Sequence, residues 1–224
     1  MRDQRYTLFS TEGVVFVMAH RGFWVLGVIA PVFFAVAVEY MGWIQPGYSQ
    51  VYQTISELGA TGSVTAQPAA LMFTFTGVMI TLFGFSLQIR LRRDDRQVWT
   101  GILVMLYGVL DFIGSGLFPV EAGGAASTLV STIHVYATLF GEFAAIGMPI
   151  WLLKDTEDGE KWDGLRAFSK ITFYFSLPLI GFLGYCILGH IPGQFDTPIG
   201  LAQRLLVGLY LLWIMRVAYF LRVI

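Results

Sequence analysis

Long apolar runs separated by short polar segments make up the sequence from residue 22 onward. Each run is about 20 residues long, which is the length that an α-helix needs to cross the hydrocarbon core of a membrane. The pattern therefore predicts a polytopic, all-α transmembrane helix bundle. Its six expected spans cover about 22–43, 69–91, 98–118, 128–153, 168–189 and 199–221.

The composition agrees with this pattern. Of the 224 residues, 56% are hydrophobic and only 13% are charged, whereas a soluble domain has roughly 25% charged residues. Six spans with short loops use most of the chain, so we expect one transmembrane domain over residues 1–224 and no separate soluble domain. The net charge of −1 argues against a nucleic-acid partner, which would require a basic surface.

Lysine and arginine residues gather in alternate connecting segments. Thirteen of the fourteen lie in the N-terminal segment, between spans two and three, between spans four and five, or near the C-terminus. Segments 44–68, 119–127 and 190–198 contain none. Because cytoplasmic loops are enriched in these residues, we predict a multi-pass protein of the cell membrane with both termini cytoplasmic. The polar N-terminal segment lacks a signal-peptide pattern, so we expect it to be retained and to begin an interfacial helix.

The ionisable residues that matter most within the spans are Asp111, His134, Glu142 and Arg204. Glu39 and Arg216 lie nearer the ends of their spans, where side chains can reach the interface. Ionisable groups are costly at membrane depth and tend to face a bundle interior or a wet cavity. Asp111, His134 and Arg204 belong to three different helices at comparable depth, and Glu142 lies eight residues deeper than His134. We therefore expect the first three to form an inward-facing cluster.

Two interpretations of this cluster are open. In the first, Arg204 neutralises Asp111, and His134 completes the hydrogen bonds of a purely structural ion pair. In the second, all three residues are catalytic. His134 is then a general base or a metal ligand, Asp111 or Glu121 orients it, and Arg204 binds a phosphate or carboxylate headgroup.

The first outer segment, at about 25 residues, is long enough to fold over the bundle, and glycines allow tight turns within it. Its hydroxyl and carboxyl groups are candidate ligand-binding groups. Together with polar residues of the other spans and loops, the ligand-binding candidates are Tyr52, Ser56, Glu57, Ser115, Glu121, Glu142 and Gln203. Ser56 or Ser115 could supply a nucleophile, although neither lies in a recognisable nucleophile motif.

No strong motif requires a cofactor. The single cysteine, Cys186, excludes an intramolecular disulfide and a multi-cysteine metal site. Zinc remains an alternative, with His134 and Glu121 as candidate ligands and His190 nearby in the outer half, but the chain has no HExxH motif. Haem is disfavoured because His190 lies at a predicted helix end.

Short motifs along the chain resemble one family. They are ISELGA at 55–60, Pro68 opening the second span, FPVE at 118–121, HxxxxxxGE from His134, and QR at 203–204. These motifs resemble the DUF998 family of prokaryotic membrane proteins, which is distantly similar to the Frag1/DRAM/Sfk1 proteins. The resemblance implies a six-helix bundle with outward-facing Glu57, Glu121, His134 and Arg204. The family usually has aspartate at the position of Glu121, and the extra methylene would loosen a metal site there.

The Frag1-like relatives are linked to lipid remodelling, so the resemblance implies lipid as the substrate class. Our first hypothesis is a lipid-directed protein that binds, modifies or hydrolyses a membrane lipid, or another small molecule, at the outer leaflet. A non-enzymatic scaffold or sensor is the first alternative. A proton-coupled small-molecule transporter using Asp111 and Glu142 is the second, although the cytoplasmic half lacks matching buried carboxylates.

Overall fold

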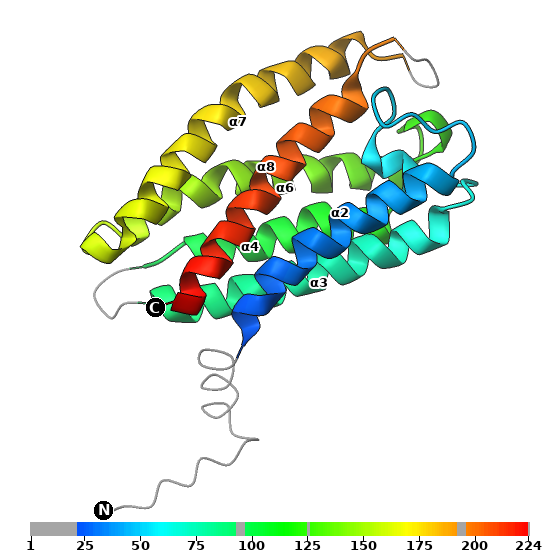
Figure 1. Cartoon of the computed structure of the whole chain (residues 1–224). Helices are drawn as coiled ribbons and strands as arrows, with labels where there is room; N and C mark the ends of the chain where they lie inside the picture. Colours follow the sequence, from blue (N-terminus) through cyan, green and yellow to red (C-terminus); the bar gives the residue numbers. More distant parts are fainter. Residues whose placement is uncertain (1–21, 93–96, 125, 192–195, 224) are drawn as a thin grey trace, which may run out of the picture.

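The computed structural model describes residues 22–92, 97–124, 126–191 and 196–223 (Figure 1). Within these ranges the chain forms helices and no strands, and six helices are long and apolar enough to cross a membrane. This result confirms the predicted all-α bundle of six spans. The expected interfacial helix and the retained N-terminal segment lie outside the described residues.

The six spans are built from helical segments that run side by side (Figure 1). Three are single long helices, and the others contain short 3-10 or π segments. In chain order they are η1 Phe23–Val25 with α2 Leu26–Ile44, α3 Ala66–Leu91, α4 Thr100–Tyr107 with η3 Gly108–Ile113 and α5 Gly114–Leu117, α6 Leu129–Asp155, η5 Glu160–Trp162 with α7 Asp163–Gly189, and α8 Ile199–Val223.

The start of the fifth span differs from the prediction. Helix α7 begins at Asp163 and not near residue 168. Its first turn is stabilised by Arg166, whose guanidinium donates to the carboxylate of Asp163 and to the carbonyl of Thr156. The prediction began the span at the first apolar residues, because hydropathy detects only the part of a helix that contacts lipid. The helix itself begins earlier, in a polar turn that hydrogen bonds stabilise.

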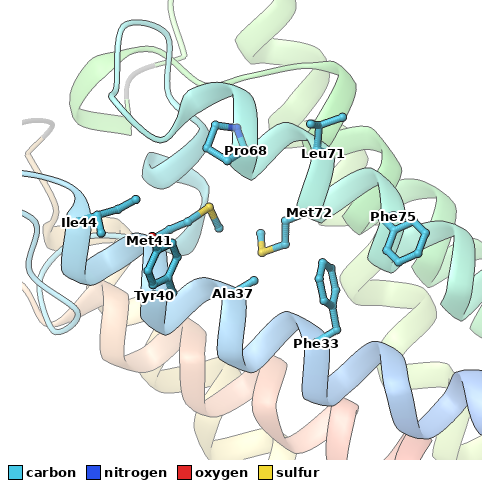
Figure 2. A pocket seen from close by; sticks show the side chains of 9 residues that line it. All are labelled: Phe33, Ala37, Tyr40, Met41, Ile44, Pro68, Leu71, Met72 and Phe75. Carbon is cyan, nitrogen blue, oxygen red and sulfur yellow. The ribbon is translucent and has the colours of Figure 1, made fainter.

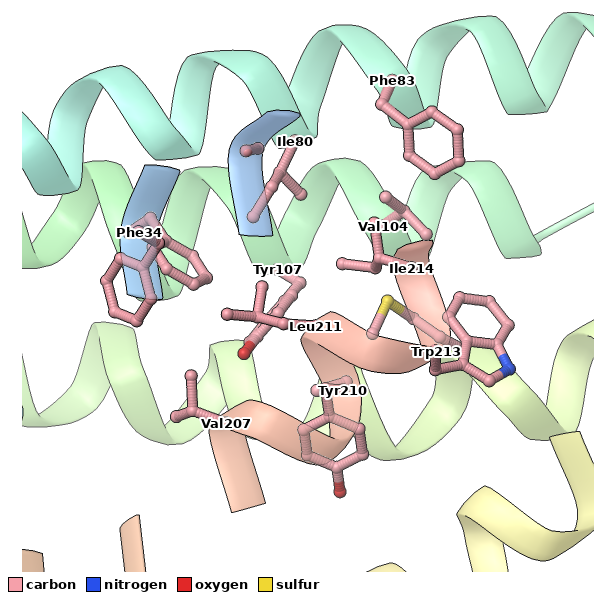
Figure 3. Close-up of a cluster of buried hydrophobic side chains, with 14 of the residues drawn as sticks. Phe34, Ile80, Phe83, Val104, Tyr107, Val207, Tyr210, Leu211, Trp213 and Ile214 are labelled. Atoms are coloured by element: carbon pink, nitrogen blue, oxygen red, sulfur yellow. The ribbon is translucent and has the colours of Figure 1, made fainter. Parts of the chain in front are cut away.

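The core lies between α2, α3, the third span, α6 and α8 (Figure 3). Its largest fully buried side chains include Trp213, Tyr107, Tyr210 and Phe83. Glycines allow α3 and the third span to touch through their backbones, because a Cβ on Gly108 would lie 2.8 Å from the carbonyl oxygen of Gly77. Small residues at such contacts are typical of helix packing in membranes.

Residues 45–65 fold over one end of the bundle, as the length of this segment predicts. The segment contains the short helix η2 Ile55–Gly59. The main-chain N–H of Ile55 donates to Gln203 Oε1 at 2.7 Å, and that of Thr61 donates to the carbonyl of Val120 at 2.9 Å. We call this end, with residues 118–124, 126–128, 190–191 and 196–198, the loop-covered end. At the opposite end α3, α6 and α8 finish (Figure 1). Because Arg90, Lys154 and Arg222 lie near those helix ends, we call it the basic end.

Candidate functional site

Arg204, on the second turn of α8, holds the covering loop in place. Its Nη1 donates to the carbonyls of Gln50 at 2.8 Å, Gln53 at 3.0 Å and Gly200 at 3.1 Å. Its Nη2 donates to the hydroxyl of Tyr48 at 2.5 Å. Among the described residues these are the hydrogen bonds of Arg204, so the ion pair with Asp111 that the first interpretation requires is not formed. The long side chain reaches the folded loop, and linear sequence does not indicate that the loop is there.

Tyr48 and Glu57 also stabilise the covering loop. The hydroxyl of Tyr48 donates to the carbonyl of Thr54 at 2.8 Å. Burial raises the pKa of Tyr48 to about 12, although the charge of Arg204 and its hydrogen bond act in the opposite direction. The carboxylate of Glu57, which is 7% exposed, accepts from the N–H of Thr54 at 2.8 Å and from Nε2 of Gln53 at 3.1 Å. Glu57 is therefore a structural acceptor in this loop.

Tyr52 and Glu121 lie in different places at the loop-covered end. Tyr52 is on the loop surface and is 40% exposed. Glu121 caps the start of α6, where its carboxylate accepts from the hydroxyl of Ser127 at 2.6 Å and the N–H of Thr128 at 2.8 Å. These hydrogen bonds lower the pKa of Glu121 to about 2.

The structure gives no support to the zinc alternative. Across the described ranges, no three or more His, Cys, Asp or Glu residues come together in a group able to hold a metal ion. His190, another ligand considered for zinc, is paired with Asp196, with 3.1 Å between Nδ1 and Oδ1. The other carboxylate oxygen of Asp196 accepts from the N–H of Ile191 at 2.7 Å, so Asp196 ties His190 to the start of the loop that follows α7.

His134 forms another polar contact between the loop and the spans. It lies on α6, is 4% exposed, and places Nδ1 2.7 Å from the carbonyl oxygen of Phe118. Its Nε2 lies 3.1 Å from Oγ of Ser56 on η2. Because a carbonyl only accepts, Nδ1 of the neutral imidazole carries the proton and Nε2 accepts a hydrogen bond from Ser56. The hydroxyl of Ser56, the imidazole of His134 and the carbonyl of Phe118 thus form one hydrogen-bonded chain, in which the carbonyl orients the base.

Ser56 also borders a small cavity of about 20 Å³, enough for about one water molecule. Four other polar residues border the same space, and they come from the third span, α6 and α8. They are Asp111, Ser115, Thr138 and Gln203. The structure therefore brings together four residues that the sequence singled out, Ser56, Asp111, Ser115 and Gln203, with His134 attached through Ser56.

The third span departs from a regular α-helix where it carries Asp111. Residues Gly108–Ile113 form a π-helix, a wider turn that is often found at functional sites. Ser115 donates to the main-chain carbonyl of Asp111 at 2.5 Å. Gly141 lets α6 approach closely, since a Cβ at that position would lie 2.7 Å from Cβ of Asp111. Asp111 thus packs against α6 beside Glu142.

Sequence reasoning missed two tyrosines at the same depth. Tyr107 and Tyr210 are fully buried, and their hydroxyls have no hydrogen-bond partner among the described residues. Each is surrounded by apolar residues in the sequence, so the pattern favours a core aromatic. Their position in the middle of a span could have identified them, because the hydroxyl of a tyrosine there lies in an apolar medium and needs a polar partner.

An apolar groove runs along the side of the bundle between α2 and α3 (Figure 2). It has a volume of about 440 Å³. Its lining comes from α2, at Phe33, Ala37, Tyr40, Met41 and Ile44, and from α3, at Pro68, Leu71, Met72 and Phe75. The rings of Phe34 and Phe73, with centroids 6.0 Å apart, line the small polar cavity. These two rings follow directly on groove residues in the sequence, so the groove and the polar cavity are close neighbours.

Comparison with known families agrees with the short motifs. The family model described as a protein of unknown function, DUF998, matches residues 28–219. The chain belongs to the DUF998 family. No curated protein and no solved structure matches it. Membership in DUF998 therefore identifies relatives without identifying a reaction.

The motifs of this DUF998 protein meet at the loop-covered end and the cavity beneath it. ISELGA forms η2 and carries Ser56, and FPVE supplies the carbonyl that orients His134. The HxxxxxxGE stretch places His134 and Glu142 on α6. The QR pair places Gln203 and Arg204 under the loop. Segments that are far apart in the sequence thus build one site.

Proposed function

We propose that this DUF998 protein is a lipid-directed membrane enzyme that cleaves an ester, with Ser56 as the nucleophile and His134 as the general base. The hydrogen bond between Ser56 Oγ and His134 Nε2 carries this proposal. A nucleophilic hydroxyl next to a base that is itself oriented by a third group is the arrangement needed for acyl transfer.

The proposed reaction uses only groups of the site, an ester and water. Ser56 Oγ attacks the ester carbonyl while its proton moves to Nε2 of His134. The carbon–oxygen bond of the ester breaks, and the leaving alcohol takes that proton. Water then attacks the acyl-serine and gives a proton to His134, which returns it to Ser56 as the fatty acid leaves. Throughout, Nδ1 donates to the Phe118 carbonyl, which holds the ring in one orientation.

The groove between α2 and α3 supports lipid as the substrate class. Its lining is apolar, and its volume of about 440 Å³ lies in the range of small-molecule pockets. From Phe33 to Ile44 it follows α2 for about 16 Å at 1.5 Å per residue, a length that suits part of an acyl chain. The rings of Phe34 and Phe73 stand beside the polar cavity and would have to move for an ester to reach Ser56.

Arg204 has a positioning role in this proposal. The sequence suggested that it binds a headgroup, but its donors hold the loop carbonyls and Tyr48. By fixing the loop that carries η2, Arg204 keeps Ser56 within reach of His134.

The test compares serine and histidine variants of the full chain purified in detergent. Ester-linked phospholipid in mixed micelles serves as substrate, and released fatty acid is measured. We expect Ser56→Ala and His134→Asn each to lower turnover by about 100-fold or more. Labelling by a fluorophosphonate probe should occur at Ser56 and disappear in Ser56→Ala. Ser63→Ala is the matched control, because Ser63 is in the same loop and donates to the carbonyl of Leu58.

Full turnover by a well-folded Ser56→Ala protein would contradict the proposal. A non-enzymatic lipid-binding protein is the second candidate, and one observation favours it: the polar cavity holds only about one water molecule. Retention of lipid in the groove together with no fatty acid release from any ester lipid would select that candidate. Thermal unfolding of each variant separates loss of the fold from loss of chemistry.

A further inference from the structure

A second polar group of residues lies deeper in the bundle than Ser56 and His134. We name it the acid–phenol cluster, and it consists of Tyr107 on α4, Asp111 on η3, Glu142 on α6 and Tyr210 on α8. Each residue is near the middle of its span. The ring centroids of Tyr107 and Tyr210 are 6.2 Å apart, and Asp111 follows Tyr107 by four residues in the same span. Glu142 is next to Gly141, where an added Cβ would lie 2.7 Å from Cβ of Asp111.

The cluster contains buried oxygen atoms that lack partners. The hydroxyls of Tyr107 and Tyr210 and Oε2 of Glu142 are buried, and none has a hydrogen-bond partner among the described residues. Both tyrosines are 0% exposed, and Figure 3 shows their rings within the apolar core. A buried polar atom without a partner is destabilising, so proteins seldom retain several in one place. These atoms therefore indicate a site for something that they can bind.

The charge of the cluster indicates what is bound. Asp111 and Glu142 are both acidic, and they come from neighbouring helices near the middle of the bundle. No lysine, arginine or histidine in the described part of the chain forms an ion pair with either carboxyl, since Arg204 holds the loop and His134 contacts Ser56 and Phe118. Two adjacent carboxylates cannot both remain charged at this depth without a positive charge between them.

We propose that the acid–phenol cluster binds one small monovalent cation, a proton or a sodium ion, which Asp111 and Glu142 share. The phenol oxygens of Tyr107 and Tyr210 complete the set of ligands. Oxygen atoms are the ligands that hard cations prefer, and a shared proton is the usual state of a close carboxyl pair. This inference does not depend on the reaction proposed for Ser56.

The path to the cluster leads from the loop-covered end. Asp111 borders the small cavity that also contacts Ser56 and Ser115, so a cation that reaches this cavity meets Asp111 first. On the other side of Glu142, residues 143–153 of α6 carry no ionisable side chain. This arrangement suits a site that fills and empties from one end of the bundle.

The experiment measures cation binding by the full chain in lipid nanodiscs. In the sodium arm, thermal unfolding is followed while NaCl replaces choline chloride at constant ionic strength and pH, and bound sodium should raise the melting temperature. In the proton arm, infrared difference spectra across a pH titration should show the carbonyl band of a protonated carboxyl. Asp111→Asn and Glu142→Gln should remove whichever response the wild type shows.

Two further variants exclude a merely structural effect. Tyr107→Phe removes a hydroxyl that has no partner, so we expect it to fold normally and to weaken binding by about tenfold. Glu39→Gln removes an exposed carboxylate near the loop-covered end and should respond as the wild type. The proposal is overturned if the wild type shows neither response, or if Asp111→Asn and Glu142→Gln respond as the wild type does.

Discussion

At Arg204, near the loop-covered end, the two terminal nitrogens of the guanidinium donate to main-chain carbonyls and a tyrosine hydroxyl, and not to an acidic side chain. A planar fork with five donors can reach the carbonyls of Gln50, Gln53 and Gly200 and the hydroxyl of Tyr48 together. A lysine offers three donors around a single point and cannot match this geometry. The stability of the loop should therefore depend on arginine itself, and not only on its positive charge.

Replacing Arg204 with lysine should lower the stability of the protein by about 2 kcal/mol, because hydrogen bonds to the loop are lost while the charge is kept. Thermal unfolding measures this effect, and limited proteolysis should show faster cleavage within residues 45–65. Arg222→Lys, at an exposed position of the basic end, is the control. An Arg204→Lys protein as stable and as protease-resistant as the wild type would show that the charge alone is sufficient.

The sequence identified both partners of the Ser56–His134 contact, but not the contact. His134 is detectable because an ionisable group inside a span is costly. Ser56 was one of several hydroxyls in the loop, without a motif around it. Their hydrogen bond joins residues 78 positions apart, and it exists only because the loop folds back over α6.

At the scale of elements, the irregular third span sets the direction of Asp111. The apolar run alone predicts an unbroken α-helix. Instead, the π-helix Gly108–Ile113 widens one turn, and Gly141 on α6 accepts Asp111 at close range. Close contact between these two elements therefore depends on the absence of a side chain at residue 141.

Gly141→Ala should destabilise the bundle by about 1–3 kcal/mol, because the new methyl group would lie 2.7 Å from Cβ of Asp111 and 2.9 Å from its main-chain nitrogen. Thermal unfolding in detergent is the measurement. The matched control is Gly208→Ala on α8, where a Cβ meets nothing within 4 Å. Since alanine favours the helix, this control should be as stable as the wild type or slightly more so. Equal stability of the two variants would rule out the close contact.

At the scale of the whole molecule, the two ends of the bundle differ in charge and in cover. One end is covered by the loops and contains Arg204 as its basic residue among those described, and the other carries Arg90, Lys154 and Arg222 (Figure 1). The enrichment of cytoplasmic loops in lysine and arginine predicts that the basic end and both termini face the cytoplasm. The site at Ser56 would then open toward the outer leaflet.

Single cysteines introduced at the two ends test this orientation. A membrane-impermeant maleimide added to intact cells should label Val64→Cys, at an exposed position of the loop-covered end, and not Glu160→Cys at the basic end. Both cysteines should react after the membrane is permeabilised. The native Cys186 is 0% exposed and should contribute little background. Labelling of Glu160→Cys and not of Val64→Cys in intact cells would show that the topology is the reverse of the predicted one.

The sequence by itself determined the six spans, the uneven distribution of basic residues and the few polar groups at membrane depth. It could do so because the cost of burying charge in lipid depends on composition and on length along one helix. Only the tertiary structure decided that Arg204 contacts the loop, that Ser56 meets His134, and that two phenols join Asp111 and Glu142. Those contacts depend on how the loop folds back, where a helix widens and which glycines let helices touch, and none of these is a property of a single segment.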